Sequence, residues 1–380
     1  DGELRFWDLS TGRTLWRGAS HTGFVRGLAF SSDGQFVVTC GDDKTVKLWS
    51  VEDDEEELVD VHNEVLTREP VTSFLGKSPM FGIDHHWREP KFVTAGSHLC
   101  LWDHDRAEPL QSLSWGSDSI SSAKFNPIEH YLVGSTSSDR TFVLYDIRGQ
   151  TPIQKLTMEM RSNCISWNPM EAFNVLLANE DHNLYTYDIR RLDSALYVHK
   201  DFVASVLCAD FSPTGREFVA GSYDRSVRIF RFNEGKSREV YHTRRMQRVF
   251  ATVFSGDARW VLTGSDDMNI RLWKANAADG TGIQLPREKR QREYQDKLKA
   301  RFKHMPDIAR IARHRHLPKP IYKARKLKET MKAARSRKDA NVKKHSKPGS
   351  VRYATLLSRA RLAIHVLLSA TNFILVQPQA

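Results

Sequence analysis

Cysteine is scarce in this sequence, and long apolar runs are missing. The 380 residues include only four cysteines, Cys40, Cys100, Cys164 and Cys208, and they lie too far apart to form a Cys-x-x-Cys pair. This spacing argues against a disulfide scaffold and a thiolate zinc site, and it suits a reducing compartment. Because no apolar run of about 18 residues and no signal peptide occurs, we expect a soluble intracellular protein.

Sequence motifs typical of enzymes are also lacking. The chain has no Gly-rich phosphate loop, no Ser or Cys nucleophile in a recognisable elbow, and no paired metal-ligand motif. His85 and His86 are adjacent, so in a strand they would face opposite ways and could not share a metal ion. We therefore expect no enzyme, no metal and no cofactor. A catalytic site without a motif is the weaker alternative.

Charge is distributed very unevenly along the chain. Residues 287–347 carry 23 Lys and Arg against 6 Asp and Glu, a net charge of +17, whereas residues 1–286 carry 31 basic and 40 acidic residues. The chain is thus a mildly acidic body followed by a strongly basic segment, here called the arm (287–347). Such an arm indicates a nucleic-acid partner, with a solvated charged helix as the plain alternative.

A repeat organises the first 274 residues. Seven short apolar segments end in an aromatic residue, at intervals of 42, 53, 43, 42, 43 and 43 positions: Trp7, Trp49, Trp102, Tyr145, Tyr187, Phe230 and Trp273. A period near 43 is typical of one four-stranded propeller blade per repeat. We therefore predict an all-β fold, a seven-bladed β-propeller, followed by a basic α-helical C-terminal extension.

An aspartate stands six positions before the aromatic residue in six of the seven repeats. These residues are Asp1, Asp43, Asp139, Asp181, Asp224 and Asp267, and Gly96 takes the place in the third repeat. An Asp in a tight turn accepts backbone hydrogen bonds and shapes the hairpin, so we interpret these residues as architectural. Together with His21, Thr39 and Trp49, this pattern resembles the WD-repeat family. Residues 1–8 match only the third strand of a blade, so we expect the first blade to be incomplete here.

The arm has a distinctive sequence of its own. Tyr294, Leu298, Phe302 and Met305 form an apolar stripe at helical spacing, which we expect to pack on the propeller or on a partner. The next segment, IARIARHRHLPKPIY (308–322), offers cations and imidazoles that could line a phosphate-binding surface. The candidate RNA- or protein-binding residues are Arg310, Arg313, His314, Arg315, His316 and Lys319. Residues 323–347 look like a solvated basic helix.

The sequence of the arm points to a narrower family among WD-repeat proteins. A WD-repeat propeller followed by REYQDKLKARFKHMPDIARIARHRHLPKPIY and KKHSKPGS is similar to the WD repeat and SOF domain-containing protein family. This resemblance implies a non-catalytic scaffold of the small-subunit processome, in the nucleus and nucleolus. Members support early processing of pre-ribosomal RNA toward the 18S species, together with the box C/D small nucleolar ribonucleoprotein and processome proteins.

The resemblance also suggests a division of the chain. We assign residues 1–276 to the WD-repeat β-propeller, 287–350 to a basic helical SOF-like domain and 351–380 to an atypical tail. That tail replaces the lysine-rich ending of the family. Its apolar stretch, 362–376, is too short and too polar for a membrane span, so we interpret the tail as a gene-model or splice artefact.

A second function of a different class comes from a short repeated motif. The segment YDIR occurs at 145–148 and again at 187–190. It resembles the box by which WD-repeat substrate receptors join cullin–RING ubiquitin ligases, with Asp146 and Asp188 orienting Arg148 and Arg190. The alternative is that each Asp and Arg simply tie neighbouring strands together. Both functions could coexist in one chain.

Overall fold

The computed structural model describes residues 2–9, 11–51, 66–115, 118–149, 151–277, 279, 285–314 and 316–347. The first repeat aspartate, Asp1, lies outside these residues, as do the candidate Arg315 and the tail 351–380. Backbone is described for Arg313 but its side chain is not.

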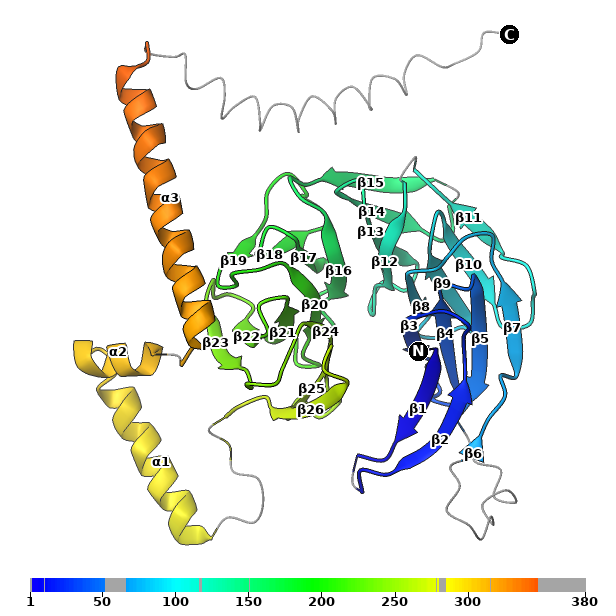
Figure 1. The fold of residues 1–380 in the computed structure, drawn as a ribbon, viewed down its shortest axis with the longest axis horizontal. Coiled ribbons are helices and arrows are strands. Elements are labelled where there is room, and N and C mark those ends of the chain that lie inside the picture. The colour runs from blue at the N-terminus through cyan, green and yellow to red at the C-terminus, as the bar shows by residue number, and fades with distance from the viewer. Residues whose placement is uncertain are drawn as a thin grey trace.

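Seven described sheets follow one another around a ring (Figure 1), and all their strand pairs are antiparallel except one in the first sheet. The first has three strands, β1 (Glu3–Trp7), β2 (Thr14–Ala19) and β6 (Leu66–Thr67), of which β6 pairs parallel to β2. The second and third are β3 (Val25–Phe30), β4 (Phe36–Gly41), β5 (Thr45–Ser50) and β7 (Thr72–Leu75), then β8 (Gly82–His85), β9 (Lys91–Ala95), β10 (Leu99–Asp103) and β11 (Gln111–Leu113).

The remaining four sheets continue the same order. They are β12 (Ile120–Phe125), β13 (Leu132–Ser137), β14 (Thr141–Asp146) and β15 (Pro152–Thr157); β16 (Ser162–Trp167), β17 (Asn174–Asn179), β18 (Leu184–Asp188) and β19 (Tyr197–His199); β20 (Val206–Phe211), β21 (Glu217–Ser222), β22 (Val227–Arg231) and β23 (Ser237–Tyr241); and β24 (Val249–Phe254), β25 (Trp260–Ser265) and β26 (Asn269–Lys274).

The predicted propeller is confirmed, with two short blades rather than one. Five sheets have four strands, and the first and the last described sheets have three each. The expected incomplete first blade is present. The last described sheet also lacks a fourth strand, and residues 274–277 contact the neighbouring blade.

Side chains of neighbouring sheets pack against each other, which is why the central strands between two sheets carry nearly continuous apolar runs. Val37, Val38 and Trp49 are fully buried in the second sheet, and Phe218 and Phe230 are fully buried in the sixth. Polar links also join neighbouring inner strands. Asp84 on β8 accepts a hydrogen bond from the backbone N–H of Phe125 on β12 at 2.8 Å.

Because successive strands in a blade run in opposite directions, the connections fall on two faces. Turns after the first and third strands of each sheet lie on one face, here called the box face because both YDIR segments end on it. Turns after the second and fourth strands lie on the opposite face, here called the arm face.

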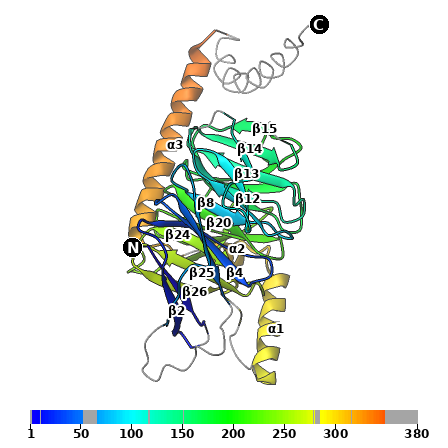
Figure 2. The same cartoon turned by 90° about the vertical axis from the view of Figure 1, so that its right-hand side faces the viewer.

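Three helices follow the propeller: α1 (Pro286–Arg301), α2 (Pro306–Arg313) and α3 (Lys319–His345). Each begins with proline in its first turn, where the missing backbone N–H is not needed. In Figure 2 the disc is seen edge-on, and Figure 1 shows that α3 begins beside β23 and projects beyond the rim of the disc. None of the helices in the described ranges is long and apolar enough to cross a membrane.

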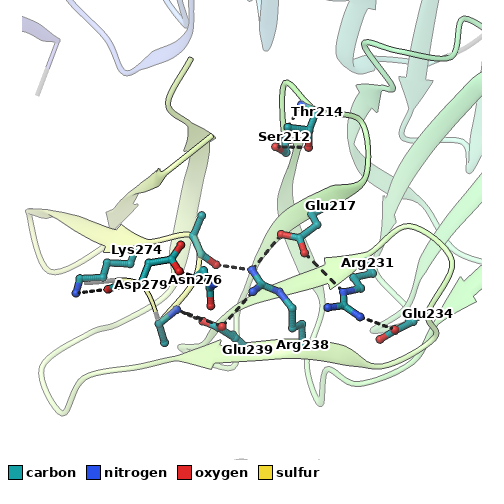
Figure 3. A network of polar contacts seen from close by, with 12 residues as sticks. Ser212, Thr214, Glu217, Arg231, Glu234, Arg238, Glu239, Lys274, Asn276 and Asp279 are labelled. Carbon is teal, nitrogen blue, oxygen red and sulfur yellow. Dashed lines mark hydrogen bonds and ion pairs between the residues drawn. The ribbon is translucent and has the colours of Figure 1, made fainter. Parts of the chain in front are cut away.

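The exit from the propeller is fixed by a polar network (Figure 3). Arg238 on β23 donates hydrogen bonds to Glu217, at 3.0 Å, and to the carbonyl oxygen of Ala275. Glu239 accepts from the backbone N–H of Ala277 at 3.1 Å, and Tyr241 donates to the carbonyl oxygen of Lys274 at 2.6 Å. These contacts hold residues 274–277 against the sixth blade.

Candidate functional sites on the two propeller faces

The repeat aspartates lie in the turns between the second and third strands, on the arm face. Asp43, Asp181 and Asp224 each accept a hydrogen bond from the backbone N–H two residues later, at 3.0 to 3.1 Å. Asp139 accepts from the Thr141 hydroxyl, and Asp267 pairs with Arg271. The residue after each Asp has a positive φ, between 60° and 74°. These contacts give the turns the shape that the sequence interpretation assumed.

The second blade contains the fullest of these arrangements. His21 Nδ1 lies 2.9 Å from Asp43 Oδ1, and His21 Nε2 lies 3.0 Å from the hydroxyl of Thr39. Trp49 donates its indole N–H to the same hydroxyl at 3.1 Å. Burial alone would raise the pKa of Asp43, but hydrogen bonds from Thr45 and His21 outweigh it and lower that pKa. In the last blade Trp273 donates to Thr263 at 2.9 Å in the same way.

The two YDIR segments have the same geometry. Arg148 Nη2 lies 2.9 Å from Asp146 Oδ2, and Arg190 Nη2 lies 2.8 Å from Asp188 Oδ2. In each pair the Nε–H also donates to the carboxylate, so the contact is bidentate. These arginines lower the pKa of both aspartates through the side-chain hydrogen bonds.

Each of these arginines also stacks on an aromatic ring. The guanidinium carbon of Arg148 lies 4.6 Å from the ring centroid of Tyr131, and that of Arg190 lies 4.1 Å from the ring centroid of Phe173. Both aromatic residues come from the turn after the first strand of the same blade. The arginine side chains stay 66% and 62% exposed. Two adjacent blades therefore present two rigidly held, accessible cations on the box face.

The arm residues are distributed over α2, the following connection and the start of α3. Arg310 and Lys319 are exposed, and the backbone N–H of His314 closes the end of α2 by donating to Ile311. His316 lies against His242 of the propeller, with ring centroids 5.7 Å apart. His316 therefore contacts the propeller, while Arg310 and Lys319 face solvent. The apolar stripe of α1 does not pack on the propeller in the described structure: Tyr294 is 64% exposed and Met305 47%.

The propeller is contacted instead by α3. Ile321 is buried at 8% exposure, Arg325 Nη1 lies 3.4 Å from Asp201 Oδ1, and Lys328 donates to the carbonyl oxygen of Phe202 at 3.1 Å. Burial, followed by the charge of Lys332, lowers the pKa of Lys328 to about 8. The interpretation of residues 323–347 as a solvated helix was therefore wrong for its first turns. Buried and half-buried residues recur at spacings of four and three, which places the docked residues on one side of the helix.

A buried charge cluster lies beneath this contact. Arg228 is completely buried, with Nη1 3.1 Å from Asp201 Oδ2 and Nη2 3.6 Å from Asp224 Oδ2. Its guanidinium carbon lies 4.9 Å from the ring centroid of Phe202. Asp201 thus pairs with an arginine inside the blade and with Arg325 on the helix. A repeat aspartate, Asp224, belongs to the same cluster and thus links its turn to the buried Arg228.

The described residues offer no site for metal or thiol chemistry. No group of three His, Cys, Asp or Glu that could hold a metal ion occurs among them. Burial raises the pKa of Cys40 and of Cys208 to about 12, which keeps both as unreactive thiols.

The fold and these sites define a WD-repeat β-propeller with a basic helical domain docked on one face. Sequence profiles agree: the Sof1-like domain matches residues 275–359, and the WD domain, G-beta repeat matches 12–50, 192–231 and 239–274. The chain is 49% identical over 351 residues to "DDB1- and CUL4-associated factor 13" of Danio rerio, covering 92% of this chain and 77% of that protein.

It is also 45% identical over 361 residues to "Protein SOF1" of Saccharomyces cerevisiae, covering 91% of this chain and 74% of that protein. Among solved structures, the WD40 β-propeller domain of Doa1 matches with a TM-score of 0.61 at 14% identity, over 73% of this chain and 88% of that one. That likeness supports the fold alone. The chain belongs to the family of Protein SOF1 and DDB1- and CUL4-associated factor 13, which confirms the resemblance inferred from the arm.

Proposed function

We propose that this chain is a non-catalytic scaffold of ribosome biogenesis that supports 18S pre-rRNA processing within the small-subunit processome, in the nucleolus. Its partners would be pre-ribosomal RNA, the box C/D small nucleolar ribonucleoprotein and processome proteins. The observation that carries the proposal is the arm itself. Its docked first turns hold a helix of 27 residues on the arm face, and its exposed cations are left for an anionic partner.

The proposal separates two parts of the molecule by their roles. The domain limits expected from the sequence, 1–276 and 287–350, would divide a protein-binding disc from an RNA-binding arm. Contacts between cationic side chains and phosphates release counterions, so RNA affinity carried by the arm must fall steeply as salt rises.

The test is RNA binding measured against salt concentration with arm variants. Neutralising Arg310, Arg313, Arg315 and Lys319 together should lower the slope of log K against log salt by about 3, at roughly 0.7 for each lost contact to single-stranded RNA. In cells, crosslinking should recover pre-ribosomal RNA around the small-subunit region, and deletion of 287–347 should strongly reduce the recovery. An unchanged slope together with unchanged crosslinking would overturn the proposal.

A second function is favoured by the paired arginines of the box face. We propose that Arg148 and Arg190, held by Asp146 and Asp188, form a docking site for the adaptor of a cullin–RING ubiquitin ligase. The name of the zebrafish relative, DDB1- and CUL4-associated factor 13, supports this class of partner. Because the two arginines lie on the face opposite the docked helix, adaptor and RNA could be held at the same time.

Charge reversal separates the two functions. Arg148→Glu combined with Arg190→Glu should abolish capture of the ligase adaptor while RNA binding by the arm stays unchanged. Arg88→Glu combined with Arg216→Glu is the matched control, because both residues are exposed in other turns of the box face. Adaptor capture that survives the first pair of substitutions would leave these arginines with a purely structural role.

A further inference from the structure

We propose that the arm face of the propeller itself binds the phosphate backbone of RNA, through an arginine patch beside the docked helix. This patch consists of Tyr223, Arg225, Arg244, Arg245 and Arg248. The inference rests on the proposed function, since it takes RNA as the partner of the arm. It adds a second RNA contact, on the disc, that the basic sequence of the arm does not contain.

The patch is assembled from two connections of neighbouring blades. Tyr223 and Arg225 lie in the turn between β21 and β22, and the other three arginines lie in the connection from β23 to β24. The two connections meet where Arg248 stacks on Tyr223, with the guanidinium carbon 4.3 Å from the ring centroid. Tyr223 is 43% exposed, and all four arginines are exposed. The stacking holds one guanidinium in place at the surface, ready to form hydrogen bonds to a phosphate.

The four arginines have no acidic partner among the described residues, unlike others on the same face. Arg26 pairs with Asp42, and Arg161 pairs with Glu180. Within the patch, Asp224 is already occupied by the buried Arg228 and by the backbone of Ser226. Asp266 is the exposed acid of the next turn, and it forms no ion pair with the patch. The patch therefore keeps its positive charge available to an external anion.

The backbone of the turn supports the same interpretation. Arg225 has a φ of 65°, in the left-handed region that favours glycine or asparagine. Lys44 and Arg140 occupy the same position in other blades, with φ of 64° and 68°. At these three turns the arm face projects a cation, whereas His182 and Met268 take the same position in two other blades.

The patch adjoins the site where α3 docks. The backbone N–H of Tyr223 donates to Ser205 at 3.0 Å, and that of Val203 donates to Asp224 at 3.4 Å, which joins the patch turn to the connection 201–205. The same connection binds Arg325 and Lys328 of α3. An RNA strand lying along the helix would therefore reach the patch without leaving the arm face. Guanidinium groups stacked on aromatic rings suit RNA, because they bind phosphate at their edges and bases on their planes.

The test uses the full chain and a fluorescent oligouridylate of about 20 nucleotides, titrated over a range of salt concentrations. Arg225→Ala combined with Arg248→Ala should lower the salt slope by about 1.4, at roughly 0.7 for each contact. The control, Arg88→Ala combined with Arg216→Ala, removes the same charge from the box face and should leave the slope unchanged. Tyr223→Phe should bind as the parent chain does, whereas Tyr223→Ala should weaken binding about as much as Arg248→Ala. Melting temperatures confirm that each variant is folded.

The possible outcomes distinguish this inference from the proposed function. Patch variants with the slope of the control would overturn the inference, and the proposed function would stand if neutralising the arm still lowered the slope. No RNA affinity in the parent chain would overturn both. A parallel titration with polyglutamate covers the acidic-protein alternative: if the patch variants lose polyglutamate binding and keep RNA binding, the patch binds acidic protein and the inference is wrong.

Discussion

Arg325 of the arm and Asp201 of the propeller form an ion pair, with 3.4 Å between Nη1 and Oδ1. The same carboxylate holds the buried Arg228 through its other oxygen, at 3.1 Å. One aspartate thus joins the interior of the sixth blade to Arg325, which lies 124 positions further along the chain. Asp201 therefore contributes both to the docking of α3, through Arg325, and to the stability of the sixth blade, through Arg228.

The two sides of this ion pair can be separated by mutation. Arg325→Ala should release the first turns of α3 and lower overall stability by no more than about 1 kcal/mol, because Arg325 is 38% exposed. Asp201→Ala should cost roughly 3–5 kcal/mol, because it leaves a buried guanidinium without its nearest partner. Hydrogen exchange of residues 319–334, measured together with thermal unfolding, distinguishes the two effects.

Lys338→Ala is the control, because Lys338 lies on the exposed, projecting half of α3. It should change neither exchange nor melting temperature. If Arg325→Ala also left exchange at 319–334 unchanged, the ion pair would not be what docks the helix.

The fold was largely predictable because its signals are local and repeated. An aspartate six positions before the aromatic residue marks one turn and one strand in six of the seven repeats, and the recurring interval predicts the ring. Docking of the arm was not predictable in this way. Arg325 and Lys328 look like the other cations of a basic helix, and only the folded propeller brings Asp201 and Phe202 to them.

The stacking of aromatic rings on the YDIR arginines could be predicted from the sequence only in part. Tyr131 precedes Arg148 by 17 positions, and Phe173 precedes Arg190 by the same interval. That repetition was present in the sequence, but an exposed aromatic residue in a turn gives no sign of its partner. The stacking follows from the blade, which places the turn after its first strand beside the turn after its third.

These rings provide a graded test of the adaptor site. Tyr131→Leu combined with Phe173→Leu keeps both ion pairs and removes both cation–π contacts, each worth about 0.5–1 kcal/mol at an exposed site. Adaptor affinity should therefore fall by roughly five- to thirty-fold, whereas charge reversal of the arginines abolishes it. Met170→Ala, an exposed apolar residue of the same turn as Phe173, should have no effect. Biolayer interferometry measures adaptor affinity for the ring variant, the charge-reversal variant and Met170→Ala. Equal losses of affinity in all three would show that any substitution here disturbs the whole face.

The hydroxyl of Thr39 accepts the indole N–H of Trp49 and lies within hydrogen-bond distance of His21. Thr39→Val should leave two buried polar groups without this partner and destabilise the chain by roughly 2–4 kcal/mol. Thr263→Val, in the last blade, removes the partner of Trp273 alone and should cost about half as much. Thermal unfolding of the two variants compares them directly, and equal losses would show that His21 adds nothing to the second blade.

Asp210 on β20 provides a prediction in which the size of the stability change depends on pH. Its Oδ2 accepts the backbone N–H of Phe254 on β24 at 2.9 Å, so it links two inner strands as Asp84 links β8 to β12. Asp84 also pairs with Lys124 at 2.8 Å, whereas Asp210 has no ion pair within the described residues. Burial raises the pKa of Asp210 to about 6, although the Phe254 N–H and the charge of Lys124 oppose it.

A folded-state pKa of about 6, above the usual carboxyl value of 3.8, means that the folded chain holds this proton more tightly than the unfolded chain does. The parent chain should therefore lose stability as pH rises from about 4 to 6, with no further loss from this group above that range.

Asp210→Asn keeps the acceptor for Phe254 and removes the buried charge, so it should stabilise the chain at pH 7 by roughly 1–3 kcal/mol and by almost nothing at pH 4. Asp84→Asn is the matched control and should destabilise at pH 7, because it leaves Lys124 without its carboxylate. Denaturant unfolding of both variants at pH 4 and pH 7 tests this, and an Asp210→Asn effect of the same size at both pH values would show that burial of the carboxylate carries no cost.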